Sequence, residues 1–222
     1  MPGGTSFVCK DHGRMKRKIG IAAAIILALF VVTGCQKQEA TPKKSEQKKT
    51  EASEELLSGT HHAEIQVKDY GTITVELDAD TAPITVTNFV NLAKDGFYDN
   101  LTFHRIMDGF MIQGGDPNGD GTGGADQTIK GEFSSNGVEN EISHTRGTIS
   151  MARAQDPDSA SSQFFIVQED SDYLDGNYAA FGHVTSGMEI VDQICKDVPV
   201  EDDNGTVKAE NQPVIEKITI TD

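Results

Sequence analysis

The fold of this chain is limited most by a series of short apolar runs that recur from residue 60 onward and are joined by glycine-rich connections. Ala63–Val67 and Thr72–Leu77 alternate apolar and polar residues on either side of residues 68–71, a pattern that predicts a β-hairpin. Further short strands are predicted at Thr102–Ile106, Phe110–Gln113, Gly147–Met151, Gln163–Val167 and Val214–Thr221.

Two segments depart from this pattern and predict short α-helices. In the first, Pro83 suits the opening turn, apolar residues recur at helical spacing from Val86 to Ala93, and Gly96 follows where a left-handed cap is favoured. The second is Met188–Ile194. Many short strands with two helices predict a mainly β domain whose antiparallel sheet closes into a barrel, because closure removes exposed edges. Side chains fill a small barrel, so we expect any binding site on its outer wall.

The start of the chain predicts an export signal. Lys16-Arg17-Lys18 precede a fourteen-residue apolar stretch, Ile19–Val32, which is shorter than the ~20 residues of a spanning helix. Met15 makes a better beginning for such a signal than Met1, and we expect it to be the true start.

The residues after the apolar stretch, Val32-Thr33-Gly34-Cys35, resemble the lipobox of bacterial lipoproteins, in which the cysteine thiol is diacylated and the chain is cut before it. Two acyl chains hold a protein on a membrane stably where one does not. We therefore expect residues 1–35 to be a signal peptide with a lipobox, and the protein to be anchored through Cys35 on the extracytoplasmic face of the cell membrane. The alternative is an ordinary secretory signal in which Cys35 is incidental.

A polar segment separates this signal from the domain. Residues 36–59 carry five positive and five negative charges and scarcely an apolar residue before Leu56-Leu57, a composition typical of a flexible tether. A linker of this length spans about 25 to 30 Å, enough to lift a domain off the lipid surface. We expect one globular domain over residues 60–222.

Acidic residues dominate this domain, which has 29 Asp and Glu against 9 Lys and Arg and hence a net charge of −20, within a total of −16 for the chain. A nucleic-acid reader needs clustered Lys and Arg to displace counterions from phosphates, so a nucleic-acid partner is not expected. Acidity of this kind keeps a protein soluble, and we expect the domain to be a monomer.

Three runs carry the functional information. They are Phe103–Asp116, which reads FHRIMDGFMIQGGD, then Ser162–Val167, which reads SQFFIV, and Ala179–Gly182, which reads AAFG. In their order and spacing these runs resemble the cyclophilin family of peptidyl-prolyl isomerases, and the likeness covers roughly Ala63 to Thr221. The resemblance implies an eight-stranded antiparallel barrel capped by a helix at each end, rotation of X-Pro bonds in polypeptides, and no cofactor.

The resemblance also implies the residues of the site. Arg105, Phe110 and Gln113 would be catalytic. Those that would contact the substrate are Met111, Ala152, Arg153, Gln163, Phe165, Tyr173, Leu174 and Tyr178. Many relatives have asparagine at Arg153, tryptophan at Tyr173 and histidine at Tyr178. These departures line the rim, and we expect activity to survive them.

The chemistry of these side chains suits isomerisation. An X-Pro bond turns slowly because rotation breaks amide resonance, at a barrier of roughly 18–20 kcal/mol. As the bond twists, the proline nitrogen regains a lone pair, so a donor aimed at that nitrogen binds the twisted state in preference to the planar one. Arg105 is the candidate donor because its guanidinium stays charged at working pH. Apolar side chains such as Phe110 and Phe165 would surround the proline ring.

Two other functions remain open. A serine hydrolase would need a nucleophile and base; Ser150 and His144 are close in sequence, but no Gly-x-Ser-x-Gly elbow occurs. A peptide-binding chaperone or surface adhesion module, with incidental isomerase activity, would use the same pocket. Whether the domain acts as an isomerase or as such a binding module, the expected clients are unfolded or extended proline-containing polypeptides.

A possible calcium loop is set aside. Asp116, Asn118 and Asp120 match its opening, but Gln127 stands where a bidentate glutamate is required. We interpret this stretch as a glycine-rich loop bordering the peptide groove, and we expect neither a metal nor a cofactor.

Overall fold

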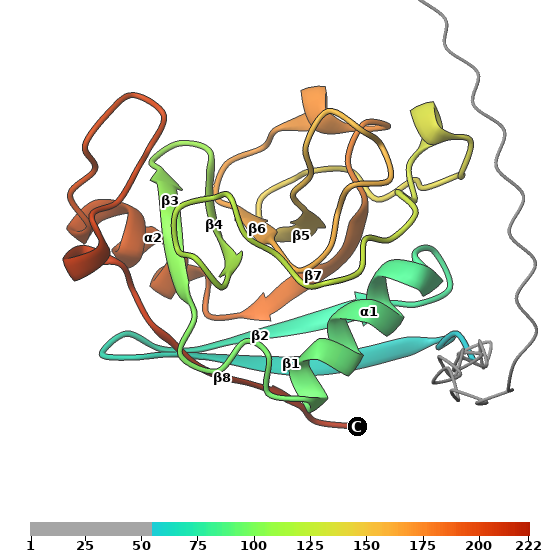
Figure 1. Cartoon of the computed structure of the whole chain (residues 1–222), viewed down its shortest axis with the longest axis horizontal. Helices are drawn as coiled ribbons and strands as arrows, with labels where there is room; N and C mark the ends of the chain where they lie inside the picture. The colour runs from blue at the N-terminus through green and yellow to red at the C-terminus, as the bar shows by residue number, and fades with distance from the viewer. Residues whose placement is uncertain (1–54) are drawn as a thin grey trace, which may run out of the picture. The chain divides into compact units, whose positions relative to one another are not determined.

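The computed structural model describes residues 55–222 (Figure 1). The predicted signal peptide, the predicted lipidation site Cys35 and nearly all of the predicted tether lie outside the described residues. Among residues 55–222, no helix combines the length and the apolar character that crossing a bilayer requires.

The described chain is built around one eight-stranded sheet whose strands run in the order β3-β4-β6-β5-β7-β2-β1-β8. Every strand pairing is antiparallel, so the mainly β prediction is confirmed. The strands are β1 (Thr60–Val67), β2 (Gly71–Asp78), β3 (Thr102–Met107), β4 (Met111–Asp116), β5 (Thr148–Met151), β6 (Phe164–Val167), β7 (Ala180–Ser186) and β8 (Ile215–Ile220).

The sheet curls into a half-barrel and does not close, so the prediction of a closed barrel is wrong. Residues 204–207 occupy part of the free edge of β3: Ile106 N donates to Gly205 O at 2.8 Å, and Val207 N donates to His104 O at 3.0 Å. β8 therefore does not run along β3, and a single bridge between Thr102 and Val214 joins β3 to the residues just before β8. The connection after α2 thus protects an edge that closure was expected to remove.

The two predicted helices are confirmed. α1 (Pro83–Lys94) begins with its proline in the first turn and packs against β2 and β8, whereas α2 (Met188–Asp197) packs against β2 and β3. Figure 1 shows the two helices near opposite ends of the curled sheet, and both contribute side chains to the same core. The predicted hairpin is also present, with β1 and β2 in register from Thr60 opposite Asp78 to Val67 opposite Gly71.

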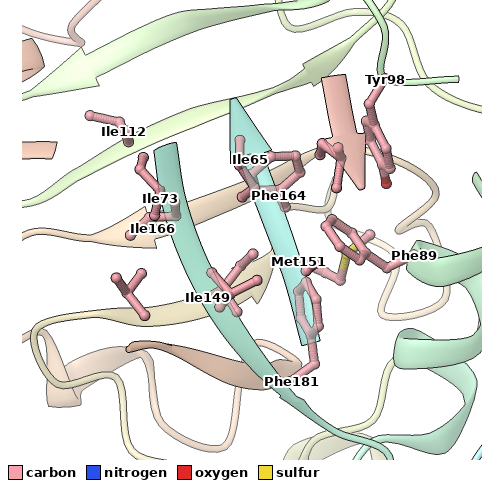
Figure 2. Close-up of a cluster of buried hydrophobic side chains, with 14 of the residues drawn as sticks. Ile65, Ile73, Phe89, Tyr98, Ile112, Ile149, Met151, Phe164, Ile166 and Phe181 are labelled. Carbon is pink, nitrogen blue, oxygen red and sulfur yellow. The ribbon is translucent and has the colours of Figure 1, made fainter. Parts of the chain in front are cut away.

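The main core fills the concave side of the sheet. Phe164 of β6 meets Phe89 of α1 edge to face, with ring centroids 5.5 Å apart, and Phe89 also packs on Tyr98 at 5.2 Å. Figure 2 shows these rings with the isoleucines of the surrounding strands. The aromatic packing fixes β6 and α1 relative to each other.

Strands β4 and β6 are buried on both faces. Phe164 and Ile166 of β6 join the main core, whereas Phe165 and Val167 join a second, smaller cluster with Met111 of β4. Side chains alternate across a strand, so this second cluster lies on the opposite, outer face of the sheet. A binding site was predicted on the outer wall, and this apolar cluster lies there.

Candidate active site

The outer-face cluster forms the wall of a cavity of about 220 Å³. Strands β3, β4 and β6 supply side chains to one part of it, and the turn before β4 and the loops after β5 and β6 supply the remainder. The residues that line it are Arg105, Phe110, Met111, Gln113, Ala152, Arg153, Phe165, Leu174 and Tyr178. The structure thus brings together nine of the eleven residues that the family resemblance implied.

Phe110 reaches the cavity because it precedes the regular strand. β4 begins at Met111, and Gly109 adopts a left-handed φ of +79° in the turn before it. The amide of Gly109 donates to the side-chain oxygen of Gln168 at 2.6 Å, which holds this turn against β6. A strict strand alternation would have turned Phe110 away from Met111, so the turn is what aims the ring at the cavity.

Arg105 presents its guanidinium at the side of the cavity. Its Nε donates to the backbone oxygen of Asn204 at 2.8 Å, and Nη2 donates to the side-chain oxygen of the same residue at 3.2 Å. None of the ion pairs within residues 55–222 involves Arg105. Burial lowers the pKa of the guanidinium from its usual value, but an arginine stays protonated at any working pH.

A chain of amides continues from Arg105. Arg105 Nη1 donates to Gln113 Oε1 at 3.2 Å, and Gln113 Nε2 donates to Gln163 Oε1 at 2.9 Å. Gln163 Nε2 then donates to the backbone oxygens of Gly123 at 2.8 Å and Gly121 at 3.2 Å. Each carboxamide is oriented by its neighbours, so the guanidinium and both glutamines form one fixed array along the wall.

Comparison with known proteins decides the family. A sequence model of the family described as "Cyclophilin type peptidyl-prolyl cis-trans isomerase/CLD" matches residues 62–222. The chain belongs to this family. It is 45% identical over 146 residues to a peptidyl-prolyl cis-trans isomerase of Helicobacter pylori, covering 65% of this chain and 86% of that protein. It is 46% identical over 140 residues to peptidyl-prolyl cis-trans isomerase B of Bacillus subtilis, covering 61% of this chain and 94% of that protein.

A solved structure agrees. The cyclophilin-type isomerase of Cryptosporidium parvum, determined in the presence of the dipeptide Ala-Pro, superposes with a TM-score of 0.64 at 31% identity, covering 72% of this chain and 99% of that one. The described domain is therefore a cyclophilin in sequence and in fold. The family model, the relatives and the solved structure confirm the predicted isomerase activity.

Two predicted site residues of this cyclophilin lie just outside the cavity. Gln163 lines a neighbouring hollow of about 250 Å³ that shares Gln113, Ala152 and Arg153 with the cavity. Tyr173 is 67% exposed, and its ring centroid lies 6.0 Å from that of Phe110. Tyr173 therefore covers Phe110 from the solvent side.

Arg153 braces the rim of the cavity. Its guanidinium lies 4.8 Å from the ring centroid of Tyr178 and 5.1 Å from that of Phe133, so both rings contact the charge. Nε and Nη2 both donate to the backbone oxygen of Asn177, and Nη1 donates to that of Ala154. Because the backbone oxygens of Asn177 and Ala154 accept these donors, Arg153 holds Tyr178 in place and lines the rim mainly with the aliphatic part of its side chain.

His144, Ser150 and Asp175 form a hydrogen-bonded triad behind the cavity. His144 Nδ1 lies 2.8 Å from Asp175 Oδ1, and His144 Nε2 lies 3.0 Å from Ser150 Oγ. Ser150 is 0% exposed, however, and the imidazole stacks on Phe165 with centroids 6.0 Å apart. Burial lowers the pKa of His144. A buried serine cannot reach a substrate, so this triad supports the site and does not argue for a hydrolase.

The predicted glycine-rich loop is held by one carboxylate. Asp116 accepts the backbone amides of Asn118 at 2.8 Å and Gly121 at 2.6 Å, which uses the oxygens that a cation would need. Within the described part of the chain, no group of three or more His, Cys, Asp or Glu side chains is placed to hold a metal.

Sequence reasoning missed two partners of Arg105. Asn204 lies 99 positions away in the chain, and nothing in its local sequence indicates that it binds a guanidinium. Met107 contacts Arg105 through its sulfur and lies within the first run, but it was not among the predicted site residues. A period of two does place Met107 on the same strand face as Arg105.

Proposed function

We propose that this cyclophilin accelerates X-Pro rotation by donating a hydrogen bond from Arg105 to the proline nitrogen as the nitrogen becomes pyramidal. The observation that carries this proposal is the position of Arg105, which lies at the edge of the apolar cavity and forms an ion pair with no carboxylate of residues 55–222. An ion pair would hold the guanidinium, whereas the present partners are the side-chain amides of Gln113 and Asn204, a backbone carbonyl and two thioethers.

The two thioethers are important because they leave N–H donors of Arg105 available to the proline nitrogen of a substrate. Arg105 Nη2 lies 3.0 Å from the sulfur of Met107, and Nη1 lies 4.0 Å from that of Met111, which lines the cavity. A thioether is only a weak acceptor. Transfer of a donor from sulfur to the proline nitrogen therefore costs little, while the strong bonds to Asn204 and Gln113 keep the guanidinium in place.

The magnitude of this interaction is sufficient for part of the catalysis. A hydrogen bond from a charged group contributes about 1.5–3 kcal/mol, or roughly 10- to 150-fold in rate. The apolar wall adds to it, because a twisted amide is less dipolar than a planar one and loses less on leaving water. Phe110, Met111, Phe165 and Leu174 form that wall around the proline ring.

Gln113 and Gln163 would hold the peptide backbone on one side of the bond that turns. Both carboxamides are fixed by their neighbours, and the hollow beside Gln163 continues the cavity past Ala152. An extended peptide could therefore place its proline over Phe165 and the preceding residues along the glutamines. A fixed backbone on one side confines the rotation to the other side of the X-Pro bond.

We propose further that the enzyme is a lipoprotein, anchored through Cys35 on the extracytoplasmic face, where a 24-residue tether over 36–59 presents it as a monomer to secreted or surface proteins. Clients there emerge unfolded, and their proline isomers interconvert in roughly 10–100 s unaided. The test is fractionation of cells that produce the full chain: Cys35→Ser should move the protein from the membrane to the soluble fraction. A Cys35→Ser protein that stays on the membrane would contradict the lipid anchor.

The enzymatic role is tested against the chaperone alternative with Arg105→Ala in the full chain. Under the proposal, this variant loses its effect on a refolding reaction limited by proline isomerisation, while it still binds a proline peptide. A variant that assists client folding as well as wild type, with turnover abolished, would show that binding is the function.

A further inference from the structure

Met107 occupies an unusual position for a methionine, because its sulfur faces the guanidinium of Arg105. Both residues lie on β3 two positions apart, and the distance from Arg105 Nη2 to Met107 Sδ is 3.0 Å. On its other side Met107 packs on the backbone of Gly205, where an added Cβ would lie 2.7 Å from Met107 Cγ. The Met107 side chain is therefore wedged between Arg105 and the loop that carries Asn204.

Met107 is also accessible. It is half-buried, and it lines a second cavity of about 240 Å³ between α2 and residues 200–205. Two other methionines of the described chain, Met111 and Met151, are each 1% exposed. Met188 is half-buried as well, but it lies at the start of α2 and packs on the main core. An oxidant from solvent would thus reach Met107 and Met188 before the buried pair.

We propose that Met107 is an oxidation site through which a hydroperoxide reversibly switches off Arg105, an inference that rests on the catalytic role proposed for that arginine. The sulfur lone pair attacks one peroxide oxygen, the O–O bond breaks, and an S–O bond forms. Sulfur loses two electrons and the peroxide is reduced by two; hydrogen peroxide leaves as water, and an organic hydroperoxide leaves as the corresponding alcohol. The product is methionine sulfoxide, which methionine sulfoxide reductases return to the thioether.

The switch follows from the change in acceptor strength. In the reduced enzyme the thioether holds Nη2 weakly, so that donor can be released. A sulfoxide oxygen is polar, and a charged donor facing it makes a charge-assisted hydrogen bond of the strong class. The guanidinium is then drawn toward Met107 and no longer donates freely at the proline nitrogen. Peptide affinity depends on the apolar wall and the glutamines, so it changes less than turnover.

The thiol that lines the same cavity does not compete. Cys195 is 7% exposed, and burial raises its pKa to about 12. The thiolate is the reactive form, and very little of it exists at neutral pH. Oxidation at this cavity therefore falls on Met107.

The experiment treats the purified full chain with graded hydrogen peroxide, reverses any thiol oxidation with dithiothreitol, and maps added oxygen by peptide mass spectrometry. Turnover on a proline peptide is measured on the same samples. The fraction of turnover lost should follow the fraction of Met107 oxidised, reaching about tenfold or more at completion, the size expected for one charged hydrogen bond. Treatment with both epimer-specific sulfoxide reductases should restore it.

Three variants sharpen the test. Met107→Leu is nearly volume-conserving, and its turnover should be the same before and after treatment with peroxide. Met188→Leu, the matched control, should be inhibited like wild type. Met107→Gln carries an amide oxygen in place of a sulfoxide and should lose turnover without oxidant. The wild-type dose series and its repair need no variant, so a variant that misfolds leaves the test intact.

Three results would overturn the proposal: full turnover with Met107 completely oxidised, equal inhibition of Met107→Leu and wild type, or oxygen added at Met188 while Met107 stays reduced. The catalytic role of Arg105 is judged separately, on untreated Arg105→Lys. If Arg105→Lys is impaired and the oxidised wild type is not, only the switch fails. If Arg105→Lys turns over like wild type, the proposed function fails first.

Discussion

Asn204 holds Arg105 by two hydrogen bonds across 99 residues of sequence: its backbone oxygen accepts from Nε at 2.8 Å and its side-chain oxygen accepts from Nη2 at 3.2 Å. The loop that carries Asn204 also pairs with the edge of β3 through Gly205, so the same contact leaves the barrel open and positions the guanidinium. Fold and site are linked at this point of the molecule.

Removal of the Asn204 side chain should therefore reduce turnover. Asn204→Ala keeps the backbone bond but removes the side-chain bond that positions the guanidinium, and we expect kcat/KM to fall by about tenfold, the lower end for a hydrogen bond to a charged group. The neighbouring exposed Asp203→Ala serves as the control and should retain wild-type kcat/KM. An Asn204→Ala enzyme with full activity would mean that this contact does not position Arg105.

A carboxylate introduced beside Arg105 should inhibit the enzyme. Gln113→Glu is isosteric, and its oxygen would replace the amide oxygen 3.2 Å from Nη1, forming an ion pair that retains the guanidinium. We expect kcat to fall by about tenfold or more at pH 7, and to recover as acid protonates the glutamate, whose ordinary pKa is about 4.3. Gln66→Glu, an exposed change on β1, controls for the added charge. Equal loss of activity at all pH values would point to misfolding.

The catalytic rate of wild type should not depend on pH near neutrality. The proposed mechanism contains no titrating group, and burial lowers the pKa of His144, the histidine stacked behind Phe165. We expect kcat/KM to be nearly flat from about pH 6 to 9 on intact protein, whereas a histidine base would give a bell-shaped profile. A bell centred in that interval would contradict the mechanism.

Stability, unlike activity, should fall in mild acid. His104 is buried with neither ring nitrogen hydrogen-bonded within the described chain, and burial lowers its pKa. As pH falls, His104 therefore binds a proton in the unfolded chain before it does so in the folded chain. The contribution of neutral His104 to the free energy of unfolding is fully present above about pH 6.5 and is lost as pH falls toward the folded pKa. His104→Leu should make the free energy of unfolding less sensitive to pH below about pH 6.5, at no cost at pH 7.5.

The contrasting variant is His144→Leu. His144 has partners on both nitrogens, so its replacement removes one donor from Asp175, which keeps those of Ser143 Oγ and the His144 amide, and takes the imidazole partner from the buried Ser150 Oγ. We expect the free energy of unfolding at pH 7.5 to fall by about 1–3 kcal/mol. Equal effects of the two substitutions, measured by urea denaturation, would show that the hydrogen-bond partners are not what distinguishes these histidines.

The sequence predicted those features that follow from local periodicity. The hairpin of β1 and β2 follows from the alternation of apolar and polar residues, and the helix that begins at Pro83 follows from its proline and its apolar spacing. The set of cavity residues needed the family resemblance in addition, because they come from separate segments that only the sheet order brings together.

The features that could not be predicted from the sequence depend on contacts between distant segments. β7 was not identified as a strand because Gly182 interrupts its pattern, yet any side chain there would collide with the backbone of Glu76 on the neighbouring β2. Arg153 was assigned to the substrate, but its donors serve the backbone of Asn177, 24 residues away. Such pairings involve carbonyl groups, which every residue has, so no residue type in the sequence indicates them.

The central claim is tested most directly by NMR exchange between the cis and trans forms of a proline peptide, catalysed by the full-length wild type and by Arg105→Lys, with peptide affinity measured on the same samples. Lysine keeps the charge but loses the fork that Asn204 and Gln113 hold. The same substitution at Arg146, which pairs with Asp192, is the control. The account predicts that Arg105→Lys slows catalysed exchange by about tenfold or more with little change in Kd. An unchanged exchange rate would contradict it.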